Sequence, residues 1–278
     1  MEIRLGPAGL PIGLKEARNT VEGIKFVHEI GLNAMEIEFV RNIYLDEKSS
    51  KIVGKIGRDL DVKLSIHAPY FINLLSEKPL TVLRSKKLII KCMKLASLMG
   101  ASPVVVHAAY YGKLKPNEAF KEMVKITKEI LLQTKKMKLN TQLSYETMAK
   151  TSQFGSLEEL LKLKEEVNDE NFTITVDFAH IFVRNNGKID YEEIFDKIEE
   201  SGIKTLHSHF SNVKYNLNKK RFVDIHIPIN SHPSFKPLAE EILRRKKDIT
   251  IISESPLLEK DSLKMKKIFE FLGYNFKL

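Results

Sequence analysis

Two kinds of segment alternate along the chain. Short runs rich in Val, Ile, Leu and Thr, typical of strands covered on both faces, are each followed by a longer run with the helical spacing of apolar residues. The predicted strands span residues 2–5, 34–39, 63–67, 104–107, 141–146, 173–177, 205–209 and 250–254. The pattern therefore predicts an α/β protein.

Predicted helices fill the gaps between these strands. Pro116 precedes a helix near 118–137, and Ser156 with Glu159 has the pattern of a capping box that opens another. Further helices are predicted over 80–98, 191–200, 235–245 and 262–272. Strand–helix units in this order and number favour a closed (β/α)8 barrel over a doubly wound open sheet. We predict a single TIM-barrel domain over residues 1–278.

Composition narrows the class of protein. A chain of 278 residues that is 43% hydrophobic can bury one large core. The start lacks a signal-peptide core, and no apolar run approaches the roughly 20 residues that span a bilayer, so we expect a soluble cytoplasmic protein without membrane contact. The single cysteine, Cys92, excludes an internal disulfide and a Cys-rich zinc site, and its helical surroundings predict a buried, inert thiol. The glycine-rich nucleotide motifs are absent, so no nucleotide cofactor is expected.

The formal net charge of +9 has two interpretations. A basic surface attracts a polyanion such as nucleic acid. A lysine-rich surface also keeps a protein in solution with no such partner. Charge alone leaves both open.

The predicted strands end in ionisable side chains. Six of the eight end in a residue that can bind a metal, and an Asp-x-His pair lies between the last two strands. The strand ends of a barrel converge on one face, where catalytic groups gather, so these residues are expected to surround one small volume. They are His67, His107, Glu146, Asp177 with His180, His209 with the nearby His207, Asp224 with His226, and Glu254.

Such a cluster requires cations. Carboxylates brought together repel one another unless a positive charge lies between them. Neutral imidazole favours zinc or another borderline divalent ion over magnesium. Nine candidate ligands suit two or three ions, and such clusters act on phosphate esters by binding phosphate oxygens, activating water and stabilising the leaving oxygen. Phosphodiester hydrolysis is thus the predicted chemistry.

With these residues in place, the chain resembles the endonuclease IV family of zinc-dependent apurinic/apyrimidinic endonucleases over about residues 2–272. The most specific stretch is Ser-Ile-His-Ala-Pro-Tyr-Phe-Ile-Asn-Leu at 65–74. The motifs that follow in the family's order are Val-Val-Val-His at 104–107, Tyr-Glu-Thr-Met at 145–148, Asp177 with His180, Asp224-x-His226 and Glu254-x-Pro256.

The resemblance implies about three zinc ions per chain and a ligand set for each. His67, His107 and Glu146 would hold the first ion. Glu146 would bridge to a second, held also by Asp177, His209 and Glu254, and the third would lie among His180, Asp224 and His226. Glu146 and Glu254 are the predicted catalytic carboxylates. The implied reaction is hydrolysis of the phosphodiester 5′ to an abasic site in double-stranded DNA, which leaves a 3′-hydroxyl, by a protein expected to be a monomer.

Two residues are candidates for DNA contact. Tyr70 matches a family position that contacts DNA, or it is a packed rim aromatic. Arg41 lies in the loop after the second strand, which is shorter than the family's DNA-penetrating loop, and it either enters the DNA or is an ordinary surface arginine. The family's His-Pro-Gly and Ile-Gly motifs are replaced by His107-Ala108-Ala109 and by Ile229-Asn230. These departures concern DNA recognition rather than metal binding.

Three alternatives remain at this point. His207 and His209 compete for one ligand position; we prefer His209, with His207 orienting a ligand from the same strand face. A sugar isomerase or epimerase of the xylose-isomerase-like barrels would use Glu146, Asp177, His209 and Glu254 around one or two ions, but it does not account for the other ligands. A noncatalytic DNA-binding barrel would have no need of a complete ligand set.

Overall fold

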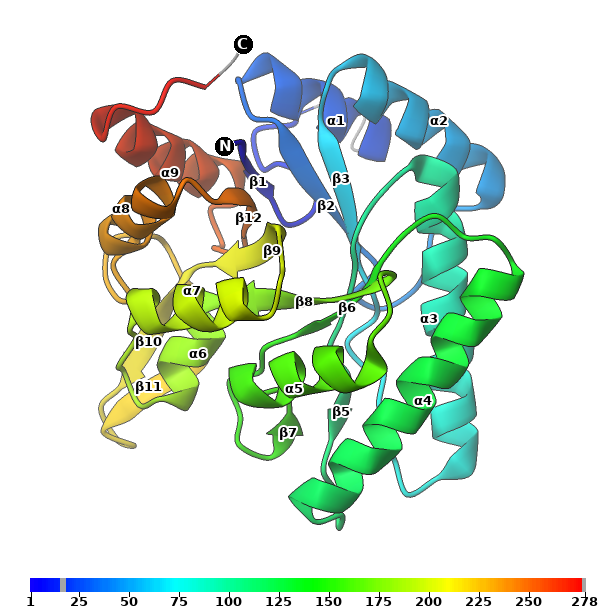
Figure 1. The fold of residues 1–278 in the computed structure, drawn as a ribbon. Helices are drawn as coiled ribbons and strands as arrows, with labels where there is room; N and C mark the ends of the chain where they lie inside the picture. The colour runs from blue at the N-terminus through cyan, green and yellow to red at the C-terminus, as the bar shows by residue number, and fades with distance from the viewer. Residues whose placement is uncertain (16–18, 277–278) are drawn as a thin grey trace. The chain divides into compact units, whose positions relative to one another are not determined.

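The computed structural model describes residues 1–15 and 19–276. Its main sheet has eight strands in the hydrogen-bonded order β1-β12-β9-β8-β6-β4-β3-β2, and a parallel bridge between Ala8 and Glu36 links the two ends of this order (Figure 1). The strands are β1 (Ile3–Pro7), β2 (Ala34–Glu38), β3 (Lys63–His67), β4 (Val104–Val106), β6 (Leu143–Glu146), β8 (Phe172–Asp177), β9 (Thr205–Phe210) and β12 (Asp248–Ser253). This is the predicted (β/α)8 topology, and each predicted strand is present within about two residues of its expected ends.

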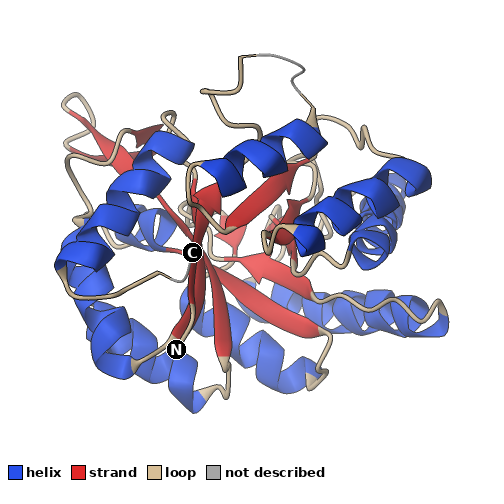
Figure 2. Cartoon of the chain, turned by 90° about the horizontal axis from the view of Figure 1, so that it is seen from above, coloured by secondary structure: helices blue, strands red, loops and turns tan. Residues whose placement is uncertain are grey.

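Helices separate these strands along the chain. Figure 2 distinguishes the helices, in blue, from the strands, in red. The Ser156 side chain accepts from the main-chain N–H of Glu159, and the Glu159 carboxylate accepts from the N–H of Ser156, so the predicted capping box is confirmed. The helices are α1 (Thr20–Glu29), α2 (Glu47–Asp59), α3 (Pro79–Met99), α4 (Pro116–Lys136), α5 (Leu157–Val167), α6 (Phe178–Arg184), α7 (Tyr191–Glu200), α8 (Phe235–Arg245) and α9 (Glu259–Phe271). None of the helices in the described part of the chain is long and apolar enough to cross a membrane.

Two compact units make up the described chain. Unit 1 comprises Met1–Glu36, Ile56–Lys63 and Val176–Leu278, and unit 2 comprises Ile37–Lys55 and Leu64–Thr175. Each buries its own apolar core: Leu5, Ile251 and Phe269 are fully buried in unit 1, and Val105 and Tyr145 in unit 2. The single domain over residues 1–278 stays a prediction.

Two short antiparallel pairs were not predicted. In unit 1, β10 (Asn212–Asn216) pairs with β11 (Arg221–Ile227), with an irregular register between Val213 and Lys214. In unit 2, β5 (Ala109–Tyr110) pairs with β7 (Gln153–Phe154). The first pair bears on the candidate site because β11 carries the predicted ligands Asp224 and His226.

Candidate metal centre

Three predicted ligands meet in unit 2 at the ends of neighbouring strands. His67 ends β3, His107 follows β4 directly and Glu146 ends β6, so the parallel register of these strands brings them to the same level. The Nε2 atoms of His67 and His107 lie 3.1 and 2.9 Å from the same oxygen of Glu146. His67 and Glu146 are fully buried, and His107 is partly exposed. The two imidazoles thus converge on one carboxylate oxygen.

The hydrogen bonds of the His67 ring indicate that His67, His107 and Glu146 require a positive charge between them. The Nδ1 atom of His67 lies 2.8 Å from the main-chain carbonyl of Ala68. A carbonyl oxygen only accepts, so Nδ1 carries a proton. The contact of Nε2 with the Glu146 carboxylate at 3.1 Å then needs either a second proton, which makes the ring an imidazolium that donates to Glu146, or a metal ion bound by both groups. The nitrogen and oxygen donors of this group fit a borderline divalent ion such as zinc.

Tyr70 lies over the same group. Its ring stacks on His107 with 5.1 Å between centroids and 30° between the planes, and it meets His67 edge-on at 4.9 Å. Its hydroxyl is 3.5 Å from Glu38. The ring remains 42% exposed, so it offers an aromatic surface beside two candidate ligands.

A second group lies in unit 1, at the start of α6. The Asp177 carboxylate accepts from the main-chain N–H of His180 at 2.8 Å and so caps the helix that carries this histidine. The two nitrogens of His180 face two carboxylates: Nδ1 is 3.5 Å from Asp177 and Nε2 is 3.3 Å from Asp224. His226, from β11, places its Nε2 3.6 Å from the same oxygen of Asp224.

Main-chain hydrogen bonding also orients His226. Its Nδ1–H donates to the carbonyl of Glu254 at 3.0 Å, which leaves Nε2 for the group around Asp224. Burial alone would lower the pKa of His226, but the bond with Asp224 and the charges of Glu254 and Asp177 raise the pKa to about 9. Burial would raise the pKa of Asp224, but the hydrogen bonds and charges of His180 and His226 hold that pKa well below its usual value. The carboxylates around His226 thus favour a positive charge at this place, whether it is a proton on the imidazole or a metal ion.

The remaining predicted ligands of unit 1 form a third group. Asp177, His209 and Glu254 each offer one ligand atom, and these atoms lie within 4.8 Å of one another. The Nδ1 atom of His209 lies 3.4 Å from Glu254. Asp177 contributes to this group as well as to the one at α6. That Glu146 bridges to this group stays a prediction.

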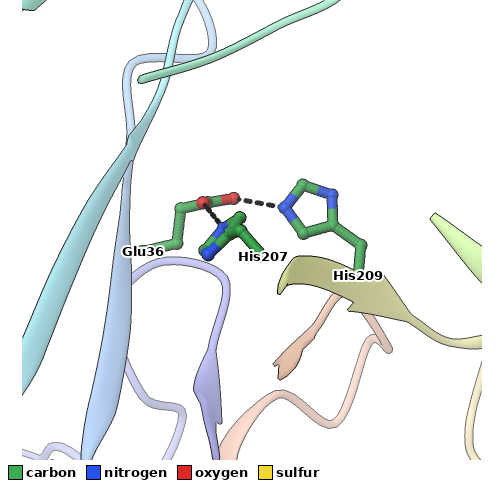
Figure 3. A group of neighbouring side chains, drawn as sticks. All are labelled: Glu36, His207 and His209. Carbon is green, nitrogen blue, oxygen red and sulfur yellow. Dashed lines mark hydrogen bonds and ion pairs between the residues drawn. The ribbon is translucent and has the colours of Figure 1, made fainter. Parts of the chain in front are cut away.

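A fourth group contains a residue that we did not predict. Glu36, in the middle of β2, directs one carboxylate oxygen at Nε2 of His209 at 2.8 Å and the other at Nε2 of His207 at 2.9 Å (Figure 3). Glu36 and His209 are fully buried and His207 is 5% exposed. Burial would raise the pKa of Glu36, but the charge and hydrogen bonds of the two histidines hold it well below its usual value. Burial lowers the pKa of His207 despite the opposing effect of Glu36.

A signal for Glu36 was present in the sequence. Residues 34–39 read Ala-Met-Glu-Ile-Glu-Phe, and a strand covered on both faces rarely carries a charge at its centre. Glu36 lies at the centre of its strand, so it falls outside the pattern of metal-binding residues at strand ends. Of the other residues considered from the sequence, Arg41 is exposed in the loop after β2, and Cys92 is fully buried in α3 as expected.

Comparison with known proteins places this geometry in a family. Residues 24–272 match the model of the family described as xylose isomerase-like TIM barrel. The chain belongs to this family. Its fold class is therefore the predicted (β/α)8 barrel.

Relatives in this family carry the endonuclease name. The chain is 33% identical to the probable endonuclease 4 of Persephonella marina over 56% of this chain and 57% of that one. It is 32% identical to an uncharacterised protein of Methanocaldococcus jannaschii over 96% and 97% of the two chains. The likeness to endonuclease IV that the motifs indicate is thereby confirmed.

Solved structures with different names share the fold. Endonuclease IV from Thermus thermophilus has a TM-score of 0.66 at 17% identity and covers 95% of this chain and 98% of its own. A D-tagatose 3-epimerase-like protein has a TM-score of 0.74 at 21% identity and covers 98% and 96%. At these identities the likeness establishes the barrel and does not choose between nuclease and epimerase chemistry.

Proposed function

We propose that this protein is a zinc-dependent DNA-repair endonuclease that hydrolyses the phosphodiester 5′ to an abasic site in double-stranded DNA and leaves a 3′-hydroxyl. The observation that carries the proposal is the number of separate histidine–carboxylate groups. His67 and His107 face one carboxylate, His180 and His226 face another, and His209 faces Glu254. A single ion has too few coordination positions for all of them, so more than one ion is expected.

The ligands divide as the resemblance implies. His67, His107 and Glu146 would hold one ion. Asp177, His209 and Glu254 would hold a second, and His180, Asp224 and His226 would hold a third. When bound, zinc would stabilise charge on the phosphate and activate water at neutral pH. The protein orients His67 and His226 through main-chain carbonyls and keeps Glu146 and Asp177 fully buried, so the donor atoms are placed before the ions bind.

Sugar epimerisation is the rival function, and the chain's own side chains argue against it. Proton transfer between carbons needs a carboxylate available as a base near a single metal centre. Here the carboxylates of Glu146 and Asp224 each face two imidazoles. The net charge of +9 favours a polyanionic substrate over a neutral sugar.

The deciding experiment is a cleavage assay. A duplex with one abasic analogue, labelled at the 5′ end of the damaged strand, is incubated with zinc-loaded protein, and the same duplex with an intact nucleotide serves as control. We expect a single nick 5′ to the lesion, a product that a DNA polymerase can extend, and complete inhibition by a chelator. An intact duplex under zinc-replete conditions, together with turnover of a ketose such as D-tagatose, would overturn the proposal.

A further inference from the structure

Glu36 is a buried carboxylate between two imidazoles, and each ring contacts a different oxygen. The contact with His207 is a hydrogen bond of 2.9 Å, and the contact with His209 is an ion pair of 2.8 Å. A buried charge is costly unless donors satisfy it. His207 satisfies one oxygen of Glu36, because the Nε2–H of its neutral ring donates a hydrogen bond to that oxygen. The second oxygen faces His209 alone among these two rings (Figure 3).

His209 lies between two carboxylates, and the distances to them differ. Its Nε2 is 2.8 Å from Glu36, whereas its Nδ1 is 3.4 Å from Glu254. A neutral imidazole carries one proton, and the closer of the two carboxylates favours it on Nε2. The Nδ1 lone pair then faces the group that contains Asp177 and Glu254.

Two other predicted ligands, His67 and His226, are also oriented by a hydrogen bond from one ring nitrogen, but the acceptor differs. The main-chain carbonyl of Ala68 holds the Nδ1 proton of His67, and the carbonyl of Glu254 holds that of His226. His209 has a carboxylate in this role. An anionic acceptor makes the imidazole a stronger donor to a metal than a carbonyl does, and losing such a partner costs about 10- to 100-fold in metal affinity.

We propose that Glu36 is the positioning residue for His209: it holds the Nε2 proton, directs Nδ1 at the metal group of Asp177 and Glu254, and is itself fixed by His207. The inference rests on the proposed function only in taking His209 as a metal ligand. It adds Glu36 on β2 and His207 on β9 to the residues that determine metal affinity.

Glu36, His207 and His209 could instead hold an ion themselves. Their ligand atoms lie within 4.8 Å of one another, as those of the other groups do. The arrangement nevertheless argues against a bound ion, because the two Nε2 atoms contact different oxygens and the contact of His207 is a hydrogen bond. In the group of Glu146, by contrast, both Nε2 atoms converge on one oxygen. Convergence on a shared point is what coordination of one ion requires.

The test measures zinc rather than activity. Glu36→Gln removes the charge and keeps the size, and zinc affinity is determined by competition with a chromophoric chelator. We expect one zinc equivalent to lose about 10- to 100-fold in affinity while the others are unchanged. Glu259→Gln is the matched control, because Glu259 is a buried carboxylate of unit 1 that accepts only from the main-chain N–H groups of Ile12 and Gly13 among its described hydrogen bonds. It should leave zinc affinity unchanged.

A crystal structure with anomalous scattering at the zinc edge locates the ion. A peak beside Nδ1 of His209, with Glu36 within hydrogen-bond distance of Nε2, supports the proposal. A peak between Glu36 and the two Nε2 atoms overturns it, as does equal zinc affinity of Glu36→Gln and the wild type. Because zinc is the readout, reduced affinity in a protein that leaves abasic DNA intact would refute the endonuclease proposal and keep this one.

Discussion

The Nε2 atom of His67 lies 3.1 Å from the carboxylate of Glu146, while its Nδ1–H donates to the Ala68 carbonyl. Nε2 can face the carboxylate either as the second N–H donor of an imidazolium or as a ligand of a metal ion that the carboxylate also binds. In both cases the negative charge of Glu146 balances a positive charge beside it. His107 contacts the same oxygen, so Glu146 is the residue whose charge this group most needs.

Glu146→Gln should abolish most activity on abasic DNA with the fold retained. The amide keeps the volume but loses the negative charge that balances a bound cation, so we expect at least a 100-fold fall in kcat/KM and the loss of at least one zinc equivalent. Glu129→Gln, on the surface of unit 2 where Glu129 pairs with Lys86 at 2.7 Å, is the control. Near-normal turnover by Glu146→Gln would refute the assigned role.

Chelation should lower thermal stability as well as activity. A ligand present at about 100 times its Kd stabilises the folded state by about 2.7 kcal/mol, which in a chain of this size corresponds to roughly 5–10 °C in Tm. Scanning calorimetry of the zinc-loaded and chelated protein measures the difference. Zinc should restore the Tm and magnesium should not, because imidazole donors select the softer ion. Equal restoration by magnesium would contradict the zinc assignment.

The sequence indicated the candidate ligands more readily than the residues that orient them. His67, His107 and Glu146 could be found because a metal-binding side chain at the end of an apolar strand breaks a clear pattern, and a barrel brings strand ends to one face. Glu36 escaped because its role depends on which strand lies opposite in space, and nothing local to β2 specifies His207 and His209 as its partners.

The same limit applies to the loops. Asp224 and His226 could be named as a pair from their spacing, but the hairpin of β10 and β11 that carries them was not predicted. Its register is irregular at Val213, and its turn lacks the short Asn-Gly or Asp-Gly signal that marks a tight hairpin. Helix ends were predictable where side chains cap locally, as at Ser156.

Cys92 should make the stability of the protein fall at high pH. Burial raises the pKa of its thiol to about 12, whereas an unfolded thiol ionises near about 8.5. Because the pKa is higher in the folded state, the free energy of unfolding does not depend on this thiol below about pH 8.5. It falls as the pH rises toward 12, by about 2 kcal/mol at pH 10. Urea denaturation of the wild type and of Cys92→Ala between pH 8 and 10 isolates this pH dependence, because the variant has no thiol at that position. Parallel stability curves would contradict a buried thiol.

Tyr70 should contribute to binding of the DNA and not to binding of the metal. Its ring stacks on His107 yet stays 42% exposed, and stacking of a base on such a ring is worth about 1–3 kcal/mol. Tyr70→Ala should therefore raise KM for the abasic duplex by about 5- to 100-fold with zinc content unchanged. Tyr70→Phe should stay near the wild type, because the hydroxyl lies 3.5 Å from Glu38, at the edge of hydrogen-bonding range. Tyr110→Ala removes a side chain of unit 2 that is also 42% exposed and serves as the matched control. An unchanged KM for Tyr70→Ala would leave Tyr70 as a rim aromatic that packs on His107.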